Sequence, residues 1–265
     1  MPESPKQKKQ MSYSAIGLST PYSVPWSSKD RPVHVQQRID ENFTKYTLPT
    51  AFSYLFTGQD DYYKNFPDLP SAQKIVEKLF KKKLSLEILD LGTGSGTFLT
   101  SLKTKYGNQV QVLGISAIDY RKFDERTGLE RKKPIPIPDE EYAIGNIENL
   151  DQLPSLQGRS FDVIFCSFTM MHLYDPICFL CQSYELLNPK AIFITDGFIP
   201  NGVSIDQLSK SLKKYKAKVI QDTGLIPSRF ILRIKKTVPH LELPIAYKPD
   251  DQSPGSAITY TPGNK

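Results

Sequence analysis

The segment that most constrains the fold is residues 86–99, which read LEILDLGTGSGTFL. A short apolar run, typical of a buried strand, reaches Asp90 and is followed by a turn with glycine at every second position. These are Gly92, Gly94 and Gly96, and a run that fits a helix comes next. Glycines between a strand and a helix allow a sharp turn and let the backbone approach a ligand closely. The segment therefore predicts an α/β domain with a nucleotide-binding turn.

Strand and helix patterns alternate around this turn. Apolar strand patterns occur at 86–91, 109–115, 142–146, 161–167, 191–197, 218–223 and 230–236. Helical patterns occur at 71–82, 95–106, 172–187 and 203–215. This alternation predicts a Rossmann-like, seven-stranded and mostly parallel sheet with helices on both faces. The last two strands lack a long helix between them, which indicates an antiparallel edge strand.

Composition divides the chain into four parts. Residues 1–34 are rich in Pro, Ser and Lys and are expected to be a flexible arm. Residues 35–70 carry many Tyr and Phe side chains at mixed helical spacing, which fits either an aromatic helical lid or a helix that simply buries its rings. Residues 71–246 form the α/β domain, and residues 247–265 read as a loose tail.

The segment between the second and third strands breaks the alternation. Its prolines, Pro134, Pro136 and Pro138, are incompatible with a helix interior, so an exposed and functional loop is expected. A short helix over residues 123–131 is the alternative for its first half.

Charge and cysteine content narrow the class of protein. The formal net charge of +6 mildly favours an acidic partner. No apolar run reaches the roughly 20 residues that span a bilayer, and the polar N-terminus lacks a signal-peptide core, so a cytoplasmic location is expected. The thiols of Cys166, Cys178 and Cys181 lie in apolar surroundings. They read as buried core groups, with a redox or zinc site at the C-x-x-C pair as the alternative, and no metal site is predicted.

The glycine-rich turn resembles the first motif of the class I S-adenosylmethionine-dependent methyltransferases, acid-x-G-x-G-x-G. A dinucleotide-binding G-x-G-x-x-G would need glycine where Thr97 stands, and the Lys of a phosphate-binding P-loop is absent. The resemblance implies that Asp90 accepts a hydrogen bond from the amino group of the cofactor. It also places Gly92, Thr93, Gly94 and Gly96 in the cofactor-binding turn.

The resemblance implies further cofactor contacts at the ends of the next strands. The acidic residue that binds the ribose in the family is replaced by Ser116, so either Ser116 makes one contact or Asp119 bends back to the ribose. An ordinary turn carboxylate is the alternative reading of Asp119. Asn146 and Ile147 stand at the adenine position, where an amide and a backbone N–H can pair with the base.

The fourth strand ends in Ser167 and Phe168, which are expected to face the ligand crevice. His172 follows and is the candidate general base, although a histidine here can also pack against the cofactor or cap its helix.

The resulting functional prediction is a methyltransferase that uses S-adenosyl-L-methionine and releases S-adenosyl-L-homocysteine. Its acceptor is predicted to be a small molecule or a protein side chain. Two alternatives remain open. The departures at Ser116, Asn146 and Lys190–Ala191 fit a catalytically silent, methyltransferase-like binding protein. The positive charge fits a tRNA or rRNA methyltransferase, with nucleic acid as the partner.

Overall fold

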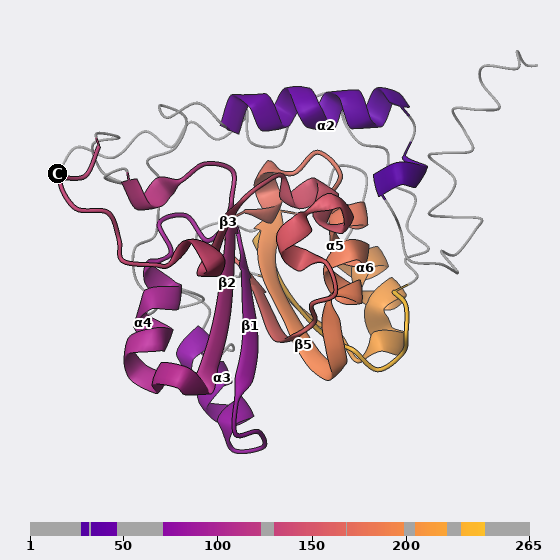
Figure 1. Ribbon diagram of the computed structural model, residues 1–265. Helices are drawn as coiled ribbons and strands as arrows, with labels where there is room; N and C mark the ends of the chain where they lie inside the picture. Colours follow the sequence, from indigo (N-terminus) through magenta and orange to yellow (C-terminus); the bar gives the residue numbers. More distant parts are fainter. Residues whose placement is uncertain are drawn as a thin grey trace, which may run out of the picture.

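The computed structural model describes residues 28–31, 33–46, 71–122, 130–167, 169–198, 205–221 and 229–241. Within these ranges a seven-stranded sheet has the order β3-β2-β1-β4-β5-β7-β6 (Figure 1). Its strands are β1 (Leu86–Leu91), β2 (Val110–Ser116), β3 (Tyr142–Ile144), β4 (Phe161–Cys166), β5 (Leu187–Phe198), β6 (Lys218–Gln221) and β7 (Arg229–Lys235). β7 runs antiparallel to β5 and β6, whereas the other pairs are parallel. The predicted mixed sheet is therefore confirmed.

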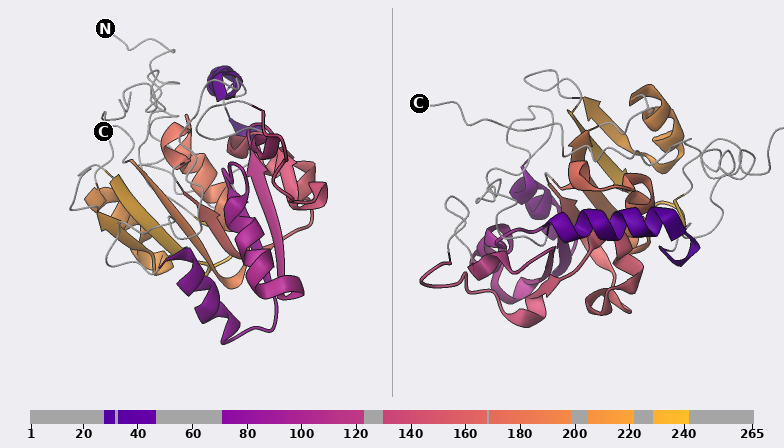
Figure 2. Two further views of the ribbon diagram at one scale, coloured as in Figure 1. Left: turned by 90° about the vertical axis from the view of Figure 1, so that its left-hand side faces the viewer. Right: turned by 90° about the horizontal axis from the view of Figure 1, so that it is seen from above.

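Helices cover both faces of the sheet (Figure 2). The α-helices are α2 (Val33–Tyr46), α3 (Ala72–Phe80), α4 (Thr97–Tyr106), α5 (Pro176–Glu185) and α6 (Ile205–Leu212). The short 3-10 helices are η1 (Ser28–Asp30), η2 (Gly107–Gln109), η3 (Tyr120–Lys122), η4 (Asp139–Glu141), η5 (Ile147–Gln152), η6 (Pro154–Leu156), η7 (Met170–His172) and η8 (Lys213–Tyr215). No helix in the described ranges has the length and apolar character needed to cross a bilayer.

The core consists of two apolar layers separated by the sheet. Ile88 of β1 packs in the layer of α3 and α4, whereas the neighbouring Leu89 packs in the layer of α5 and α6. Both side chains are fully buried, because a parallel strand at the centre of the sheet has no solvent-facing side. The three cysteines are free and buried in these surroundings, as expected.

Local geometry sets helix boundaries that the sequence pattern placed elsewhere. α4 begins at Thr97 rather than Ser95, because Gly96 has a left-handed φ of 77°. α5 begins at Pro176 rather than His172, because the side chain of Asp175 accepts a hydrogen bond from the N–H of Cys178 and Pro176 occupies the first turn. The residues before it form η7 instead.

The N-terminal part differs from the expected arm at residues 28–31. The backbone N–H of Ser28 donates to Asp151 Oδ2 at 2.8 Å, and Ser28 is 4% exposed, so this segment is packed against the domain. Helix α2 follows and lies across the end of the sheet where the parallel strands end (Figures 1 and 2). Residues 1–27, 47–70, 242–265 and most of the alternative helix at 123–131 lie outside the described residues. The aromatic lid therefore stays a prediction.

Candidate functional site

The glycine-rich turn follows β1 at the end of the sheet where ligands bind in open α/β folds. Gly92, Gly94 and Gly96 all have positive φ, at 76°, 57° and 77°, which side chains with a Cβ rarely adopt. The backbone N–H groups of Gly92 and Thr93 both donate to the carbonyl of Ile115, at 2.8 and 3.0 Å. The turn is thus held against the end of β2.

Two of these glycines are also required by close packing. A Cβ on Gly92 would lie 2.0 Å from Thr169 Oγ1, and one on Gly96 would lie 2.1 Å from Ile137 Cδ1. Thr169 follows β4, and Ile137 belongs to the loop between β2 and β3. The loop that the prolines predicted to be functional therefore packs directly on the turn.

Tyr142 fixes the carbonyl side of the same turn, and sequence reasoning did not identify it. Its hydroxyl donates to the carbonyl of Gly94 at 2.6 Å and accepts the backbone N–H of Tyr120 at 3.2 Å. Burial raises the pKa of Tyr142, so the phenol stays protonated and keeps its donor. No local sequence signal marks this role, because it depends on the start of β3 lying beside the turn.

Two carboxylates are fully buried near the ends of the central strands. Asp90 is paired in register with Gly114 of β2 and Phe165 of β4 and is 0% exposed, as expected of the motif acid. Asp196 of β5 is also 0% exposed, and sequence reasoning missed it. Its signal was an acid close before a glycine at the end of an apolar strand: Asp196 directly precedes Gly197, and Asp90 stands two residues before Gly92.

The structure separates the two candidate ribose contacts. Ser116 ends β2 and is 3% exposed beside the turn. Both oxygens of the Asp119 carboxylate are instead engaged by Arg121, with Nε to Oδ1 at 2.8 Å and Nη2 to Oδ2 at 2.9 Å. Hydrogen bonding to Arg121 lowers the pKa of Asp119. Its carboxylate is therefore ionised but held by a neighbouring cation.

The turn after β3 carries Asn146 and Ile147, the two residues predicted to contact adenine. Asn146 Oδ1 accepts the N–H of Glu148 at 3.0 Å and caps η5, while its Nδ2 is buried without a hydrogen-bond partner among the described residues. Ile147 is 7% exposed and packs in the core cluster of α5 and α6. The amide N–H groups of Asn146 are thus the polar groups that this turn leaves unpaired.

The lack of a hydrogen-bond partner among the described residues is common to three buried side-chain atoms, Thr93 Oγ1, Asn146 Nδ2 and Ser167 Oγ. Each is buried at the end of the parallel strands and has no hydrogen-bond partner within the described part of the chain. A buried polar atom left unpaired costs about 1–3 kcal/mol. A cofactor rich in hydrogen-bonding groups would satisfy them, so these residues fit the group that the glycine motif implies. Phe168, the other residue predicted at this edge, lies outside the described residues.

His172 is the last residue of η7, which begins directly after Thr169, the residue that packs on Gly92. Burial lowers its pKa to about 4, so the imidazole is neutral at pH 7. Its backbone carbonyl accepts a hydrogen bond from Asn42 Nδ2 of α2 at 3.0 Å. The structure therefore places His172 in the segment that follows β4 and packs on the turn through Thr169, as a neutral and weak base.

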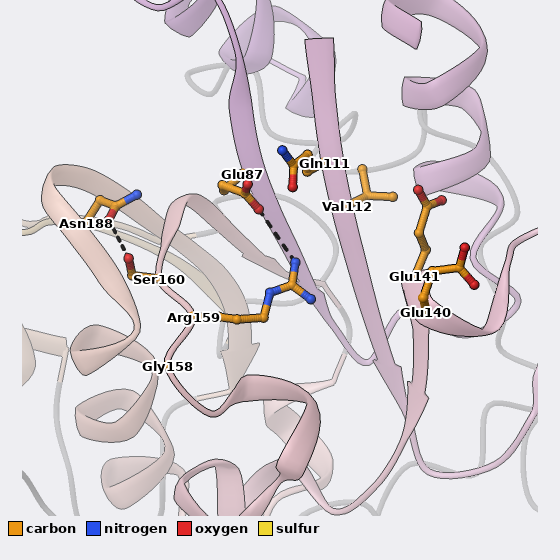
Figure 3. A pocket seen from close by; sticks show the side chains of 9 residues that line it. All are labelled: Glu87, Gln111, Val112, Glu140, Glu141, Gly158, Arg159, Ser160 and Asn188. Atoms are coloured by element: carbon orange, nitrogen blue, oxygen red, sulfur yellow. Dashed lines mark hydrogen bonds and ion pairs between the residues drawn. The ribbon is translucent and has the colours of Figure 1, made fainter. Parts of the chain in front are cut away.

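A polar cavity of about 620 Å³ lies at the opposite end of the strands (Figure 3). It is lined by Glu87, Gln111, Val112, Glu140, Glu141, Gly158, Arg159, Ser160 and Asn188. An ion pair between Arg159 and Glu87, with Nη2 and Oε2 3.6 Å apart, spans part of it. Because these residues stand at the beginnings of the strands, the cavity is separate from the glycine-rich turn. No group of three His, Cys, Asp or Glu in the described ranges is placed to hold a metal ion.

A protein-family comparison matches residues 81–241, more than half of the chain, to a family described as a methyltransferase domain. A search of curated proteins finds no match. The matched range begins after α3, so η1 and α2 lie outside it.

Solved methyltransferase structures resemble the chain at low sequence identity. The CurJ carbon methyltransferase shares 15% identity over 62% of this chain and 53% of that protein, with a TM-score of 0.44. This chain thus spans about half the length of that protein. An S-adenosylmethionine-dependent methyltransferase from Clostridium acetobutylicum shares 15% identity over 68% and 94%, with a TM-score of 0.42. The plantazolicin methyltransferase BpumL, in complex with a triazolic desmethylPZN analogue and SAH, shares 13% over 88% and 99%, with a TM-score of 0.43.

Proposed function

This chain belongs to the methyltransferase domain family, and from that premise we propose that it transfers a methyl group from S-adenosylmethionine to a small molecule or a protein side chain. The observation that carries the proposal is the set of buried, unpaired polar atoms on Thr93, Asn146 and Ser167 around the glycine-rich turn. Unpaired groups gathered at one edge of the sheet favour a polar ligand there over a purely structural turn.

The chain's own residues would hold the cofactor along this edge. Asp90 and the turn that begins at Gly92 would hold the methionine portion, Ser116 the ribose, and Asn146 the adenine. When bound, S-adenosylmethionine supplies a methyl group that is already activated by its sulfonium, and S-adenosylhomocysteine is the product.

The protein's contribution is alignment and exclusion of water. Holding a nucleophile in line with the methyl group can supply about 7–11 kcal/mol of barrier reduction. Thr169, just before η7, packs on the turn, and α2 lies at the same end of the sheet (Figure 1). η7 and α2 would form the acceptor side, where His172 is the candidate base. A histidine with a pKa of about 4 is unprotonated at pH 7 and accepts a hydrogen bond readily, but it is a poor general base. The proposed role of His172 is therefore to orient an acceptor that needs little deprotonation.

Calorimetric titration with S-adenosylmethionine and S-adenosylhomocysteine tests cofactor binding, and transfer of labelled methyl groups to small-molecule and peptide pools tests activity. Asn146→Ala is expected to weaken binding about 10-fold, the effect of one lost hydrogen bond of about 1.4 kcal/mol. Gly158→Ala, in the distant polar cavity, serves as the matched control. Failure of the folded wild-type protein to bind either compound would overturn the proposal.

One observation favours a second candidate, a cofactor-binding protein without transfer activity. The carboxylate of Asp119 is held by Arg121, and Ser116 has no negative charge, so neither supplies a free acid for the ribose hydroxyls. Comparison of Ser116→Asp with Asp119→Asn distinguishes the two contacts. We expect Ser116→Asp to tighten binding and Asp119→Asn to leave it within about 2-fold. Binding without any methyl transfer to either pool would favour the second candidate.

A further inference from the structure

Residues 28–31 and 33–46 pack against the candidate site although they lie outside the family match. Val35 and Ile39 of α2 pack with Tyr174, which precedes α5. Asn42 Nδ2 donates to the carbonyl of His172 at 3.0 Å. Helix α2 therefore lies against the segment that follows β4, on the same side as the glycine-rich turn (Figure 1).

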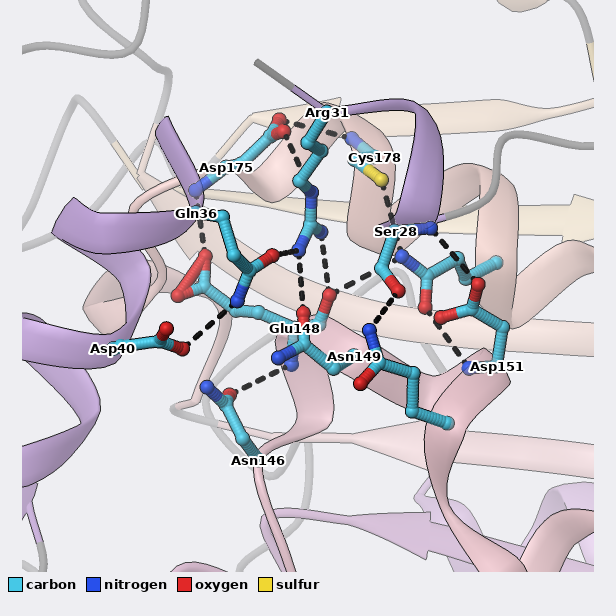
Figure 4. A network of polar contacts seen from close by, with 12 residues as sticks. Ser28, Arg31, Gln36, Asp40, Asn146, Glu148, Asn149, Asp151, Asp175 and Cys178 are labelled. Atoms are coloured by element: carbon cyan, nitrogen blue, oxygen red, sulfur yellow. Dashed lines mark hydrogen bonds and ion pairs between the residues drawn. The ribbon is translucent and has the colours of Figure 1, made fainter. Parts of the chain in front are cut away.

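Arg31 anchors this segment through a buried guanidinium and is 6% exposed (Figure 4). Its Nη2 donates to the carbonyl of Glu148 at 2.5 Å, and its Nη1 donates to Asn149 Oδ1 at 2.6 Å. Its Nε lies 3.5 Å from Asp175 Oδ2, and Nη1 also donates to Gln36 of α2 at 3.2 Å. One side chain thus bridges three elements that are distant in sequence.

Two of these elements continue into the candidate site. η5 begins directly after Asn146, whose Oδ1 accepts the N–H of Glu148, so a shift of η5 would move the adenine position. Asp175 caps α5 and accepts the N–H of Cys178 at 3.1 Å. The N–H of Asp175 in turn donates to Glu148 Oε1 at 2.6 Å. The turn after β3 and the segment after β4 are therefore joined beneath Arg31.

Helix α2 also supplies a polar group that its own contacts do not use. Asn42 is 5% exposed, and its Oδ1 has no hydrogen-bond partner among the described residues. Because Nδ2 is fixed on the carbonyl of His172, the orientation of the amide is set. Oδ1 is left to accept a hydrogen bond from a bound molecule beside His172.

We propose that Arg31 is a positioning residue that couples the cofactor side of the site to the acceptor side. When the cofactor is bound at the turn that carries Asn146, the guanidinium of Arg31 holds α2 in place. Helix α2 then presents Asn42 to an acceptor that carries a hydrogen-bond donor. This inference rests on the proposed function, which defines the cofactor side and the acceptor side of the site. Coupling of this kind is reciprocal, so an ordered α2 also strengthens cofactor binding.

The experiment measures hydrogen exchange of the amides in residues 33–46 with and without S-adenosylhomocysteine, together with its affinity by calorimetry. The variants are Arg31→Met, Arg31→Lys and the matched control Arg38→Met. Arg38 also lies on α2, but its side chain is 52% exposed, and its Nη1 pairs with Glu41 Oε2 at the surface. Arg31→Lys retains a charge that can reach one partner and serves if Arg31→Met fails to fold.

In the wild-type protein and in Arg38→Met, the ligand is expected to slow exchange in α2 at least 5-fold. In Arg31→Met that protection is expected to disappear, and the dissociation constant to rise at least 10-fold. Arg31→Lys should fall between them. The coupling is overturned if a folded Arg31 variant keeps the ligand-dependent protection, or loses no more affinity than Arg38→Met.

A wild-type protein that does not bind S-adenosylhomocysteine would overturn the proposed function and the coupling with it. The anchoring contact is decided separately by exchange without ligand. If the exchange rate of the α2 amides rises at least 10-fold in Arg31→Met and does not change in Arg38→Met, the anchoring contact is supported even without ligand binding. Equal exchange rates in the two variants would refute it.

Discussion

Two clusters of buried polar groups lie at the same end of the sheet, and they differ in how completely they are paired. Around the glycine-rich turn, Thr93, Asn146 and Ser167 each bury a side-chain atom that has no partner within the described residues. Around Arg31, Nη1 and Nη2 donate hydrogen bonds to groups of α2 and η5. Its Nε makes an ion pair with Asp175 Oδ2 at 3.5 Å without a hydrogen bond to any described residue, so this cluster is largely rather than completely paired.

The difference indicates what each cluster does. Unpaired buried groups reduce stability by about 1–3 kcal/mol each and persist where a ligand can satisfy them. A paired network stabilises the chain whether or not a ligand is bound. Substitutions in the first cluster should therefore change ligand binding more than stability, and substitutions in the second should do the reverse.

The largest effect on stability is expected from Asp175→Ala. It removes the N-cap of α5 and leaves the charge of Arg31 buried beside one acid fewer, and losing one partner of a buried pair costs about 3–5 kcal/mol. Urea unfolding measures the loss. Glu41→Ala, which breaks a surface pair on α2, should stay within about 1 kcal/mol. Equal losses in the two variants would remove the distinction between the clusters.

Gly92→Ala is expected to lower stability by about 2–4 kcal/mol and to abolish cofactor binding, because it combines a strained φ with a clash against Thr169. Gly158 also has a positive φ, of 70°, but nothing lies within 4 Å of an added Cβ. Gly158→Ala should therefore cost only about 1–2 kcal/mol, from the backbone alone. Thermal unfolding and calorimetry check both variants, and similar unfolding temperatures would contradict the packing argument.

The pH dependence of stability tests the cluster around Arg31 through the titration of Glu148. Burial raises the pKa of Glu148 to about 8, so the folded state binds more protons than the unfolded state between about pH 4.5 and 8, and stability falls as pH rises through that range. Burial lowers the pKa of His172 to about 4, so the unfolded state binds more protons at this residue between about pH 4 and 6.5. The contribution of His172 to the free energy of unfolding therefore rises with pH in that range.

The two contributions offset each other below pH 6.5, and only the decline from Glu148 remains above it. Its slope should approach about 1.4 kcal/mol per pH unit. Denaturant unfolding at pH 6.5, 7.2 and 8 measures this slope, and Glu148→Gln should flatten it. A Glu148→Gln variant with the wild-type slope would assign the decline to another group.

The smallest effect on stability is expected from Ser167→Ala. Its hydroxyl has no partner in the described structure, so the free energy of unfolding should change by no more than about 0.5 kcal/mol. Binding of S-adenosylhomocysteine should weaken about 5- to 10-fold, because the ligand loses a hydrogen bond of about 1–1.4 kcal/mol. A variant that loses stability while keeping its affinity would place Ser167 in the structural cluster instead.

The sequence predicted the sheet and the glycine-rich turn because both follow from local patterns. Apolar runs such as 161–167 read as buried strands, and alternating glycines report a backbone that must adopt positive φ. The candidate contacts at Asp90 and Asn146 stand at strand ends, where chain order alone brings them to one edge. Asp196 carried a signal similar to that of Asp90, an acid close before a glycine at the end of an apolar strand. It was missed because the resemblance supplies no role for that strand.

Local patterns could not reveal the groups that act across the chain. Tyr142 lies 48 residues from the carbonyl of Gly94 that it binds, and Arg31 lies 117 residues from the carbonyl of Glu148. In the sequence Arg31 stands in a polar segment that resembles a solvated arm. Its burial follows only once η5 and α5 provide acceptors at the right separation.

The sequence by itself determined the α/β fold, the position of the glycine-rich turn and the family of the protein, because strand periodicity and glycine spacing are properties of neighbouring residues. The tertiary structure alone decided which buried polar groups are paired. That outcome depends on distances between segments far apart in the chain. It separates the groups around Arg31, which contact one another, from those around Gly92, which we propose bind the cofactor.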